Sequence, residues 1–217
     1  MKRLSLLAAV VVAVAGGTRL AAQKVVNAGG QFTFGDYKET APALHYQGGG
    51  AGFWVGFSKG KVSADGSFLA ISYKPVDDGS TLEDFKTTQI DGRFRYYIAS
   101  GVSVEVGFTR RVADPDFAAQ SAAAARVGLR ASYLLGPGAN LALRGTYLGG
   151  GKFSGGGTAG FGFEVGLGLS VGASSGRWRF TADYEFQRFN RVTTIGGTEA
   201  KVPLQQALAR MGIAFGL

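Results

Sequence analysis

The chain has no cysteine and only one histidine, His45, among its 217 residues. The absence of cysteine excludes disulfide bonds, thiolate metal sites and a lipid-modified N-terminal cysteine. A single imidazole excludes a multi-histidine metal site, and we expect neither a metal nor a cofactor. Beyond the N-terminus there is no long apolar run, and the mean hydropathy is only +0.10. Both features argue against a bundle of membrane-spanning helices.

Proline is also scarce, with 5 residues, whereas glycine is abundant, with 36. The glycines do not follow a Gly-X-Y period, which excludes collagen. Such glycine usage together with 46% hydrophobic residues is typical of many strands joined by glycine-containing turns. A membrane barrel alternates apolar and polar residues, so its mean hydropathy stays low.

The first 22 residues have the parts of a secretory signal peptide. Met1-Lys2-Arg3 is basic, and Leu4–Ala15 is a twelve-residue apolar stretch that is too short to span a bilayer as a helix. We expect cleavage after Ala22, so that residues 1–22 are removed and residues 23–217 form one outer-membrane β-barrel domain. An uncleaved anchor is the alternative. Cleavage lowers the formal charge from +8 to +5, which suits contact with anionic lipid headgroups.

The segment Ile90–Val112 shows the main pattern of the chain most clearly. Its sequence, IDGRFRYYIASGVSVEVGFTRRV, alternates apolar and polar residues on both sides of a short turn at residues 99–101. Because side chains alternate between the two faces of a strand, one face is apolar and the other is charged. Each half has about nine to eleven residues, which is enough to cross a bilayer when tilted. This pattern is typical of membrane-spanning β-strands.

The same alternation predicts ten strands, at residues 25–35, 49–58, 67–74, 90–98, 102–112, 125–135, 141–147, 161–171, 178–187 and 209–217. An Asp65-Gly66 turn is expected, because an Asp-Gly pair between alternating runs favours a hairpin. Longer loops are expected at Asp36–Gly48, Gly149–Gly160 and Asn190–Pro203. Short and long connections alternate as in an antiparallel up-and-down barrel. The predicted fold class is therefore all-β, a transmembrane barrel of ten strands, with eight as the alternative because the first three are weakly bounded.

Which face of this barrel is inside must be decided separately. A soluble barrel would turn its apolar face inward. Three features favour the inverted arrangement: the polar face is rich in glycine, which suits a narrow lumen; aromatic residues such as Tyr96, Trp178 and Phe215 fall near strand ends, where interfacial girdles lie; and the chain is secreted. We expect Leu69, Ile71 and Tyr73 to share the outer apolar face, with Lys74 inside.

With the apolar face outside, a set of charged residues faces the lumen. Its members are Asp91, Arg93, Arg95, Glu105, Arg126, Arg130, Arg144, Glu164, Arg179, Asp183, Glu185 and Arg210. Unpaired charges in a narrow lumen would be costly, so Glu105, Asp183 and Glu185 should each pair with an arginine of a neighbouring strand, with Arg95 and Arg130 as natural partners of Glu105. A satisfied network would plug the barrel, whereas the excess of cations would suit a narrow anion-preferring pore.

The last eight residues, RMGIAFGL, resemble the C-terminal signature of bacterial outer-membrane barrels. Arg210, Gly212, Phe215 and Leu217 occupy its positions, although Phe rather than Leu is the common last residue. With the signal peptide and the strand series, residues 23–217 resemble the small OmpA- and OmpX-like barrel proteins. The resemblance implies location in the bacterial outer membrane and insertion by the barrel-assembly machinery, and it says little about activity.

No catalytic site is expected. His45 is the only imidazole for acid–base chemistry at neutral pH, and without a nucleophile motif beside it we interpret it as a loop residue. The arginines are spread singly along strands rather than in a basic patch, which argues against nucleic-acid binding. We expect a monomer that contacts outer-membrane lipids and has a structural or surface-interaction role with an unknown ligand. An anion-preferring pore and a lipid- or peptide-modifying enzyme are the alternatives.

Overall fold

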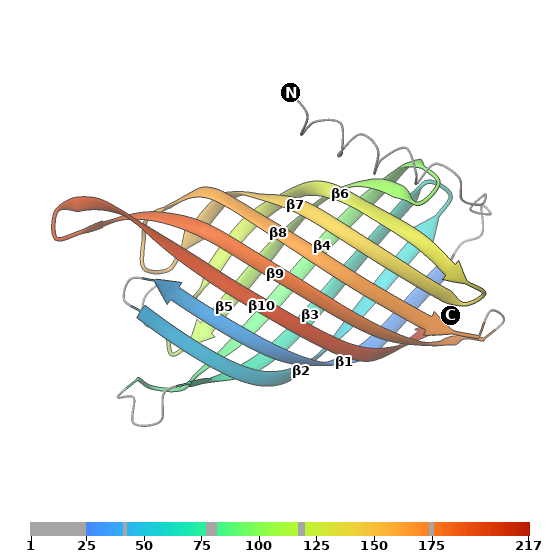
Figure 1. Cartoon of the computed structure of the whole chain (residues 1–217), viewed down its shortest axis with the longest axis horizontal. Coiled ribbons are helices and arrows are strands. Elements are labelled where there is room, and N and C mark those ends of the chain that lie inside the picture. Colours follow the sequence, from blue (N-terminus) through green and yellow to red (C-terminus); the bar gives the residue numbers. More distant parts are fainter. Residues whose placement is uncertain (1–24, 41–42, 77–81, 117–119, 174–175) are drawn as a thin grey trace.

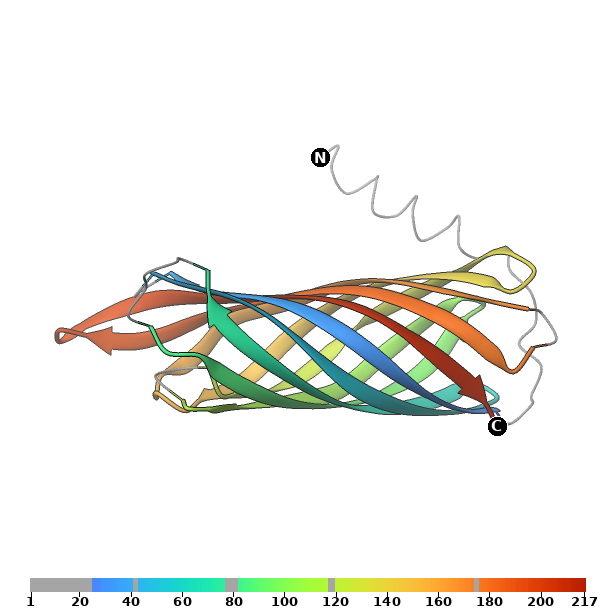
Figure 2. The same cartoon turned by 90° about the horizontal axis from the view of Figure 1, so that it is seen from below.

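The protein is a closed barrel of ten antiparallel strands. A computed structural model describes residues 25–40, 43–76, 82–116, 120–173 and 176–217. The strands are β1 (Val25–Thr40), β2 (Ala43–Lys59), β3 (Val62–Pro75), β4 (Phe85–Ala99), β5 (Val102–Asp114), β6 (Ala122–Gly136), β7 (Ala139–Phe153), β8 (Thr158–Gly172), β9 (Trp178–Ile195) and β10 (Thr198–Gly216). β1 pairs with both β2 and β10, which closes the sheet (Figures 1 and 2).

This strand number confirms the ten-strand prediction and rules out eight. The expected signal peptide, its cleavage after Ala22 and the start of the domain at residue 23 lie outside the described residues. No helix that could cross a membrane occurs within the described ranges.

Both ends of the barrel sequence meet at the end that carries the tight turns. The Leu217 backbone N–H donates a hydrogen bond to the Val26 carbonyl oxygen at 2.8 Å. The turn between β2 and β3 contains Gly60 at φ +59°, and the turn between β4 and β5 contains Gly101 at φ +73°, a left-handed conformation that glycine adopts without strain. The β9–β10 hairpin projects from the opposite end (Figure 1). By analogy with other barrels, the turn end is periplasmic and the hairpin end extracellular.

The outward face is apolar in the part of the barrel nearer the turns. On β5, Val106 and Phe108 are 44% and 53% exposed, whereas Glu105 between such positions is fully buried. On β4, Phe94 is exposed while its neighbours Arg93 and Arg95 are buried. Apolar side chains outside and charged side chains inside form the arrangement of a membrane barrel, as the alternation predicted.

Nearer the extracellular end, the polarity of the two faces is reversed. On β1 the outward residues change from Phe34 to Asp36 and Lys38, while the inward residue Tyr37 is 1% exposed. On β9, Arg188 faces outward and Phe189 is buried. Strands that rise above the bilayer have water outside, so they bury apolar side chains inside, as soluble barrels do. The barrel therefore has a membrane part and an extracellular part.

Two buried apolar clusters fill the extracellular part of the lumen. The first consists of Tyr37, Tyr46, Leu69, Ile71, Tyr73, Phe85, Ala113 and Leu208. The second consists of Ala122, Ala124, Leu148, Phe153, Phe189, Val202 and Leu204. In the first cluster the rings of Tyr73 and Phe85 stack at a centroid distance of 4.9 Å, and Tyr46 meets Phe85 edge-on at 4.8 Å.

The polarity reversal explains why the long loops were wrongly predicted. The segments Asp36–Gly48, Gly149–Gly160 and Asn190–Pro203 lie largely within strands, with connections centred on residues 41–42, 154–157 and 196–197. Their alternation continues above the membrane, but with polar residues outside and apolar residues inside. A prediction that assumes an apolar outer face along the whole strand therefore assigns such segments to polar loops.

Two further predictions for the third strand were wrong. The Asp65-Gly66 pair does not form a turn; it lies within β3, and the chain reverses at Gly60 instead. Leu69, Ile71 and Tyr73 are buried inside the barrel, and Lys74 is exposed outside, the reverse of the expectation. The cause is again the position of the upper half of β3 above the apolar band.

Candidate functional site in the barrel lumen

Glu185 on β9 is the centre of a buried charge network in the membrane part of the lumen. Its carboxylate lies 2.6 Å from Arg144, 3.0 Å from Arg93 and 3.2 Å from Arg210. Arg126 approaches its other oxygen at 3.8 Å. These arginines come from β7, β4, β10 and β6, so one carboxylate connects strands all around the barrel.

A second carboxylate, Glu164 on β8, shares the same arginines. It lies 2.9 Å from Arg126 and 2.7 Å from Arg144. Arg126 also lies 3.0 Å from Asp91 on β4, and its side chain is fully buried. Paired, hydrogen-bonded charges are the form in which a low-dielectric interior tolerates ions.

The network continues toward the periplasmic end. Glu105 on β5 lies 2.8 Å from Arg95 Nε and 3.5 Å from Arg93 Nε, both on the neighbouring strand β4. Arg95 also pairs with Asp65 on β3. Glu105 thus finds the neighbouring-strand partner that was expected in Arg95, whereas the expected pairing with Arg130 is wrong: among the described residues its ion pairs are with Arg93 and Arg95.

Three of the residues expected in the lumen network lie at its periplasmic margin. Asp183 is exposed and, within the described ranges, makes no ion pair within 4 Å, contrary to expectation. It lines a cavity of about 20 Å³ together with Arg130 and Arg144, a space for about one water molecule. Arg179 is half-buried near the start of β9. Gly168 lies beside Asp183, and a Cβ on it would come within 2.6 Å of the Asp183 carboxylate, so the space that Asp183 occupies requires a glycine there.

Several polar residues complete the network without having been singled out in the sequence. Gln187 Nε2 donates hydrogen bonds to Glu164 at 3.0 Å and to Glu185 at 2.9 Å, and Gln89 Nε2 donates to Asp91 at 2.9 Å. Both glutamines occupy inward positions of their strands. Strand alternation extended to neutral side chains could therefore have found them.

Above the charges, further buried polar groups contact the aromatic cluster. The Arg111 guanidinium hydrogen-bonds Gln206, whose Nε2 donates to the Tyr73 hydroxyl at 3.1 Å. The Tyr37 hydroxyl donates to Glu39 at 2.6 Å. Burial raises the pKa of Glu39, which lies above the apolar band at the end of β1, and the hydrogen bond from Tyr37 opposes this rise only in part.

Taken together, these layers place buried side chains in both the membrane part and the extracellular part of the lumen. The charged side chains cross from one wall to the other in the membrane part, and the aromatic clusters fill the extracellular part. Because each long side chain is held by several partners, opening a path would require breaking many contacts at once. The arrangement is suited to rigid closure.

His45 does not lie in a loop, as was expected, but on β2, facing outward. Its Nε2 lies 2.9 Å from Asp36, which also accepts a hydrogen bond from Gln47 at 3.1 Å and lies 3.5 Å from Lys38. These four side chains form a polar group on the outer wall just above the apolar band. None of the four is a serine, threonine or cysteine nucleophile.

Arg210, Gly212 and Phe215 of the C-terminal signature lie near the turn-side end of β10, and Leu217 directly follows the strand. Arg210 points inward to Glu185, while Phe215 packs on Trp178 at a centroid distance of 4.7 Å. A Cβ on Gly212 would collide with the Gly30 backbone, so the close approach of β10 to β1 requires glycine. Leu217 is exposed and anchored through its backbone to β1.

No protein-family model matches the sequence, and no curated protein matches it. Among solved structures, the outer-membrane protease OmpT from Escherichia coli is 8% identical and superimposes with a TM-score of 0.56, covering 94% of this chain and 100% of that chain. Neisserial surface protein A is 13% identical, with a TM-score of 0.40, covering 88% of this chain and 96% of that chain. Ail of Yersinia pestis is 14% identical, with a TM-score of 0.40, covering 89% and 99%. At these identities the likeness concerns the fold. The protein is a β-barrel of the bacterial outer membrane.

Proposed function

We propose that this protein is a plugged, non-enzymatic barrel of the small OmpA- and OmpX-like type, with a structural or surface-interaction role. The observation that supports it best is the cross-lumen network around Glu185, which arginines from four other strands surround. Such a barrel is a rigid support rather than a channel. A monomer inserted by the barrel-assembly machinery fits this role, and the last strand would present the Phe215 and Leu217 signature to that machinery.

The β9–β10 hairpin is the part of the barrel best suited to contact a partner outside the cell. The ladder between β8 and β9 ends at Val192, and the ladder between β1 and β10 ends at Leu204. Beyond these residues the ribbon is paired only with itself, up to the Gly196-Gly197 turn. Its residues near the tip are exposed, and the ribbon projects past the other strands (Figure 2).

Arg191 fixes the base of this hairpin to the rest of the barrel. Its guanidinium donates hydrogen bonds to the carbonyl oxygens of Gly156 at 2.7 Å and Gly155 at 2.5 Å, in the β7–β8 connection. It also lies over the Phe153 ring, 5.9 Å from the centroid. A ribbon held in this way is presented in one orientation, which favours binding because little freedom is lost.

A narrow anion-preferring pore is the second candidate, because inward arginines outnumber inward carboxylates along the lumen. The two functions make opposite predictions for conductance. The alternative of a lipid- or peptide-modifying enzyme would depend on His45 and its contact with Asp36. Turnover of a lipid or peptide substrate that His45→Gln abolishes would support that alternative.

The surface-interaction role can be tested by replacing the hairpin tip, residues 194–199, with a two-residue Asn-Gly turn. The matched control replaces Pro137 by Ala in the periplasmic β6–β7 turn. Both variants should insert, which is checked by the heat-modifiable mobility of the folded barrel. We expect only the tip variant to lose attachment of expressing cells to glass and to one another. Full attachment by an inserted tip variant would contradict the proposal.

A further inference from the structure

Two arginines lie directly opposite each other on the inner wall, toward the periplasmic end of the lumen. Arg130 on β6 and Arg144 on β7 are register partners in the sheet, and both occupy inward positions. Like charges at opposing positions of neighbouring strands destabilise a sheet. Because an arginine keeps its positive charge inside a protein, this pair requires negative charge nearby.

Arg144 receives negative charge from the central network, whereas Arg130 does not. Arg144 Nε lies 2.7 Å from Glu164, and its Nη2 lies 2.6 Å from Glu185. Within the described ranges, Arg130 has no carboxylate within 4 Å. Each of the other arginines in the network pairs with at least one carboxylate: Arg93, Arg95, Arg126 and Arg210.

The charges around Arg130 do not supply the missing partner. Arg95 and Arg144 act on its charge more strongly than Asp65 and Glu105 do. These two carboxylates already pair with Arg95. The electrostatic potential beside Arg130 is therefore positive, and an unpaired charge inside a barrel wall is costly.

A cavity of about 20 Å³ adjoins both arginines. Small residues form its wall on β7 and β8, namely Ala142, Gly166 and Gly168, so no long side chain fills it. A Cβ on Gly166 would come within 2.9 Å of Arg144 Nη2. The cavity has room for one particle of about the size of a water molecule. Arg130 has its guanidinium donors available beside it, and Arg144 retains Nη1, which makes no ion pair among the described residues.

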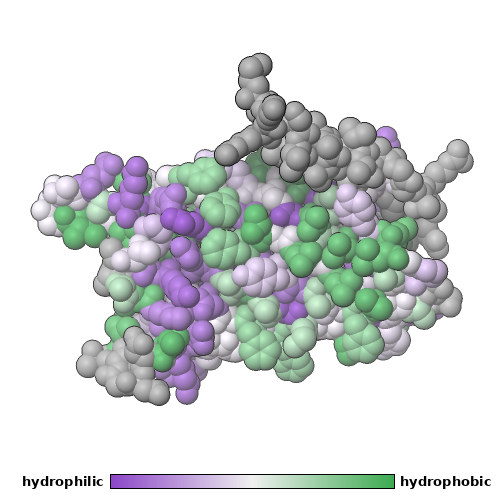
Figure 3. All heavy atoms as spheres, viewed as in Figure 1, coloured by the Kyte–Doolittle hydropathy of each residue, from purple (hydrophilic) through white to green (hydrophobic). Residues whose placement is uncertain are grey.

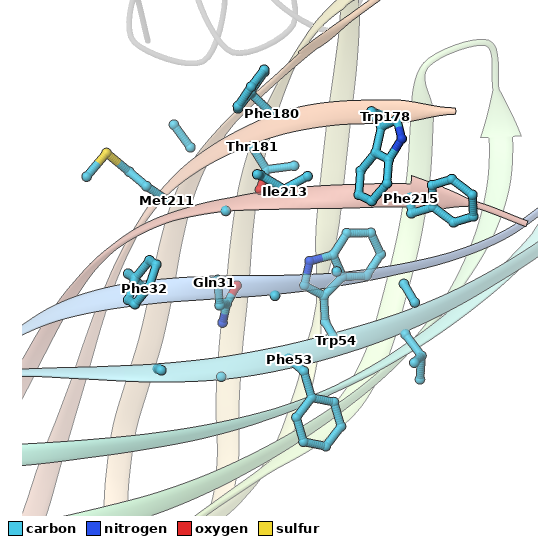
Figure 4. Close-up of a pocket in the computed structure, with 18 of the residues that line it drawn as sticks. Gln31, Phe32, Phe53, Trp54, Trp178, Phe180, Thr181, Met211, Ile213 and Phe215 are labelled. Atoms are coloured by element: carbon cyan, nitrogen blue, oxygen red, sulfur yellow. The ribbon is translucent and has the colours of Figure 1, made fainter. Parts of the chain in front are cut away.

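The cavity can be reached by water through the lumen. Asp183 also lines it, and this side chain is exposed. The outer side of the same wall is apolar: Phe32, Phe180 and Met211 line a groove of about 1030 Å³ there (Figure 4). Figure 3 shows hydrophobic side chains over the half of this face nearer the turns. An ion would lose its hydration in that region, so we expect it to enter from the periplasmic end of the lumen.

We propose that this cavity binds one small monovalent anion, such as chloride, between the guanidinium groups of Arg130 and Arg144. The anion offsets the repulsion between the two arginines and accepts charge-assisted hydrogen bonds from them. Phosphate, sulfate and organic acids have several heavy atoms and exceed the space, whereas a halide ion is close to water in size. The plugged-barrel role does not require such a site, so each can fail without the other.

The proposal is tested on the full mature protein in detergent by thermal unfolding at rising sodium chloride. Sodium gluconate keeps the ionic strength constant, because gluconate is too large for the cavity. The site variant is Arg130→Gln. The matched control is Arg179→Gln, which removes the same charge from a side chain that does not line the cavity. A third variant, Asp183→Asn, removes the carboxylate that competes with the anion.

We expect the unfolding midpoint of the wild type and of Arg179→Gln to rise by about 3–6 °C when chloride is roughly tenfold above its Kd. Arg130→Gln should show no such rise. Asp183→Asn should bind chloride more tightly than the wild type, because a repulsive charge is removed. A wild type that responds no more to chloride than to gluconate, equal responses of Arg130→Gln and Arg179→Gln, or weaker chloride binding by Asp183→Asn would each overturn the proposal.

Crystals of the wild type grown in sodium bromide give a second measurement that does not depend on the folding of a variant. Bromide scatters X-rays anomalously, so its position can be read directly. We expect an anomalous peak between the guanidinium groups of Arg130 and Arg144. Anomalous peaks at other positions only would overturn the proposal.

Discussion

Glu185 on β9 and Arg93 on β4 form an ion pair at 3.0 Å across the lumen, although their strands are not neighbours in the sheet. Such a contact connects opposite walls of the barrel directly. The backbone hydrogen bonds of the sheet connect each strand only to its two neighbours. The membrane part of the lumen thus has a structural core made of ion pairs. The proposed closure of the lumen and the stability of the barrel would both depend on this network.

Removal of the central carboxylate tests the stability of this core. Glu185→Gln leaves Arg93, Arg126, Arg144 and Arg210 without the acid they share. We expect the free energy of unfolding to fall by about 3–5 kcal/mol, the usual effect of breaking a buried ion pair. Urea titration in lipid vesicles measures it. Asp183→Asn, on the same strand but without an ion pair among the described residues, should change it little; similar losses in both variants would count against the network.

The boundary of the apolar band is tested by placing an arginine at two different heights on the outward face of β5. Val106→Arg places a charge near the middle of the bilayer and should cost about 2–4 kcal/mol. Val112→Arg lies on the same outward face of β5, above Arg110, and should be nearly neutral because that position is outside the hydrocarbon. Unfolding titrations in vesicles compare the two. A larger loss for Val112→Arg would reverse the assignment of the membrane part.

Gly50 on the inner wall allows β2 and β3 to approach closely, and a variant of the outward-facing Gly145 on β7 serves as its control. A Cβ on Gly50 would collide with the backbone oxygen of Ala70 on β3, whereas a Cβ on Gly145 would have no neighbour within 4 Å. Gly50→Ala should therefore lower the unfolding free energy by about 1–3 kcal/mol, as overpacking does. Gly145→Ala should leave it nearly unchanged. Equal effects would show that the local approach of β2 and β3 is not tight.

The aromatic cluster above the membrane should behave as a soluble core. Phe85 is 1% exposed and contacts the rings of Tyr46 and Tyr73. Phe85→Ala should cost about 3–5 kcal/mol, because it leaves a cavity that nothing fills. Phe94→Ala, on the lipid-facing side of the same strand, should cost less, because lipid chains can occupy the space. Thermal unfolding in detergent compares the stability of the two variants. A larger loss for Phe94→Ala than for Phe85→Ala would contradict this prediction.

Alternation of side chains made the barrel and its charged lumen predictable. The hairpin of β4 and β5 shows why: Phe94 and Val106 face the lipid while Arg93 and Glu105 face inward, and only a membrane barrel combines these two faces. The same parity could have identified Arg111 and Gln187. The ion-pair partner of each charged residue could not be deduced. Glu185 pairs with Arg93 across the lumen, and this pairing depends on the width of the barrel and the stagger of its strands, which alternation does not specify.

The upper halves of the strands were not predictable by the same rule. Leu69, Ile71 and Tyr73 were assigned to the lipid face because a single polarity was assumed for the whole strand. In the structure, the strand crosses the membrane surface between its two halves, and the solvent on its outer side changes from lipid to water. Lys74, exposed on the outer wall, belongs to the second environment.

The most direct test of the proposed closure of the lumen is single-channel recording in planar bilayers. We predict that the wild type shows no stable opening, since paired charges and aromatic clusters fill the lumen. Arg93→Ser/Arg126→Ser/Arg144→Ser should conduct, whereas Arg110→Ser/Arg177→Ser/Arg188→Ser, with the same loss of charge outside the lumen, should stay closed. Stable, ohmic, anion-selective openings of the wild type would contradict the plug and support the pore.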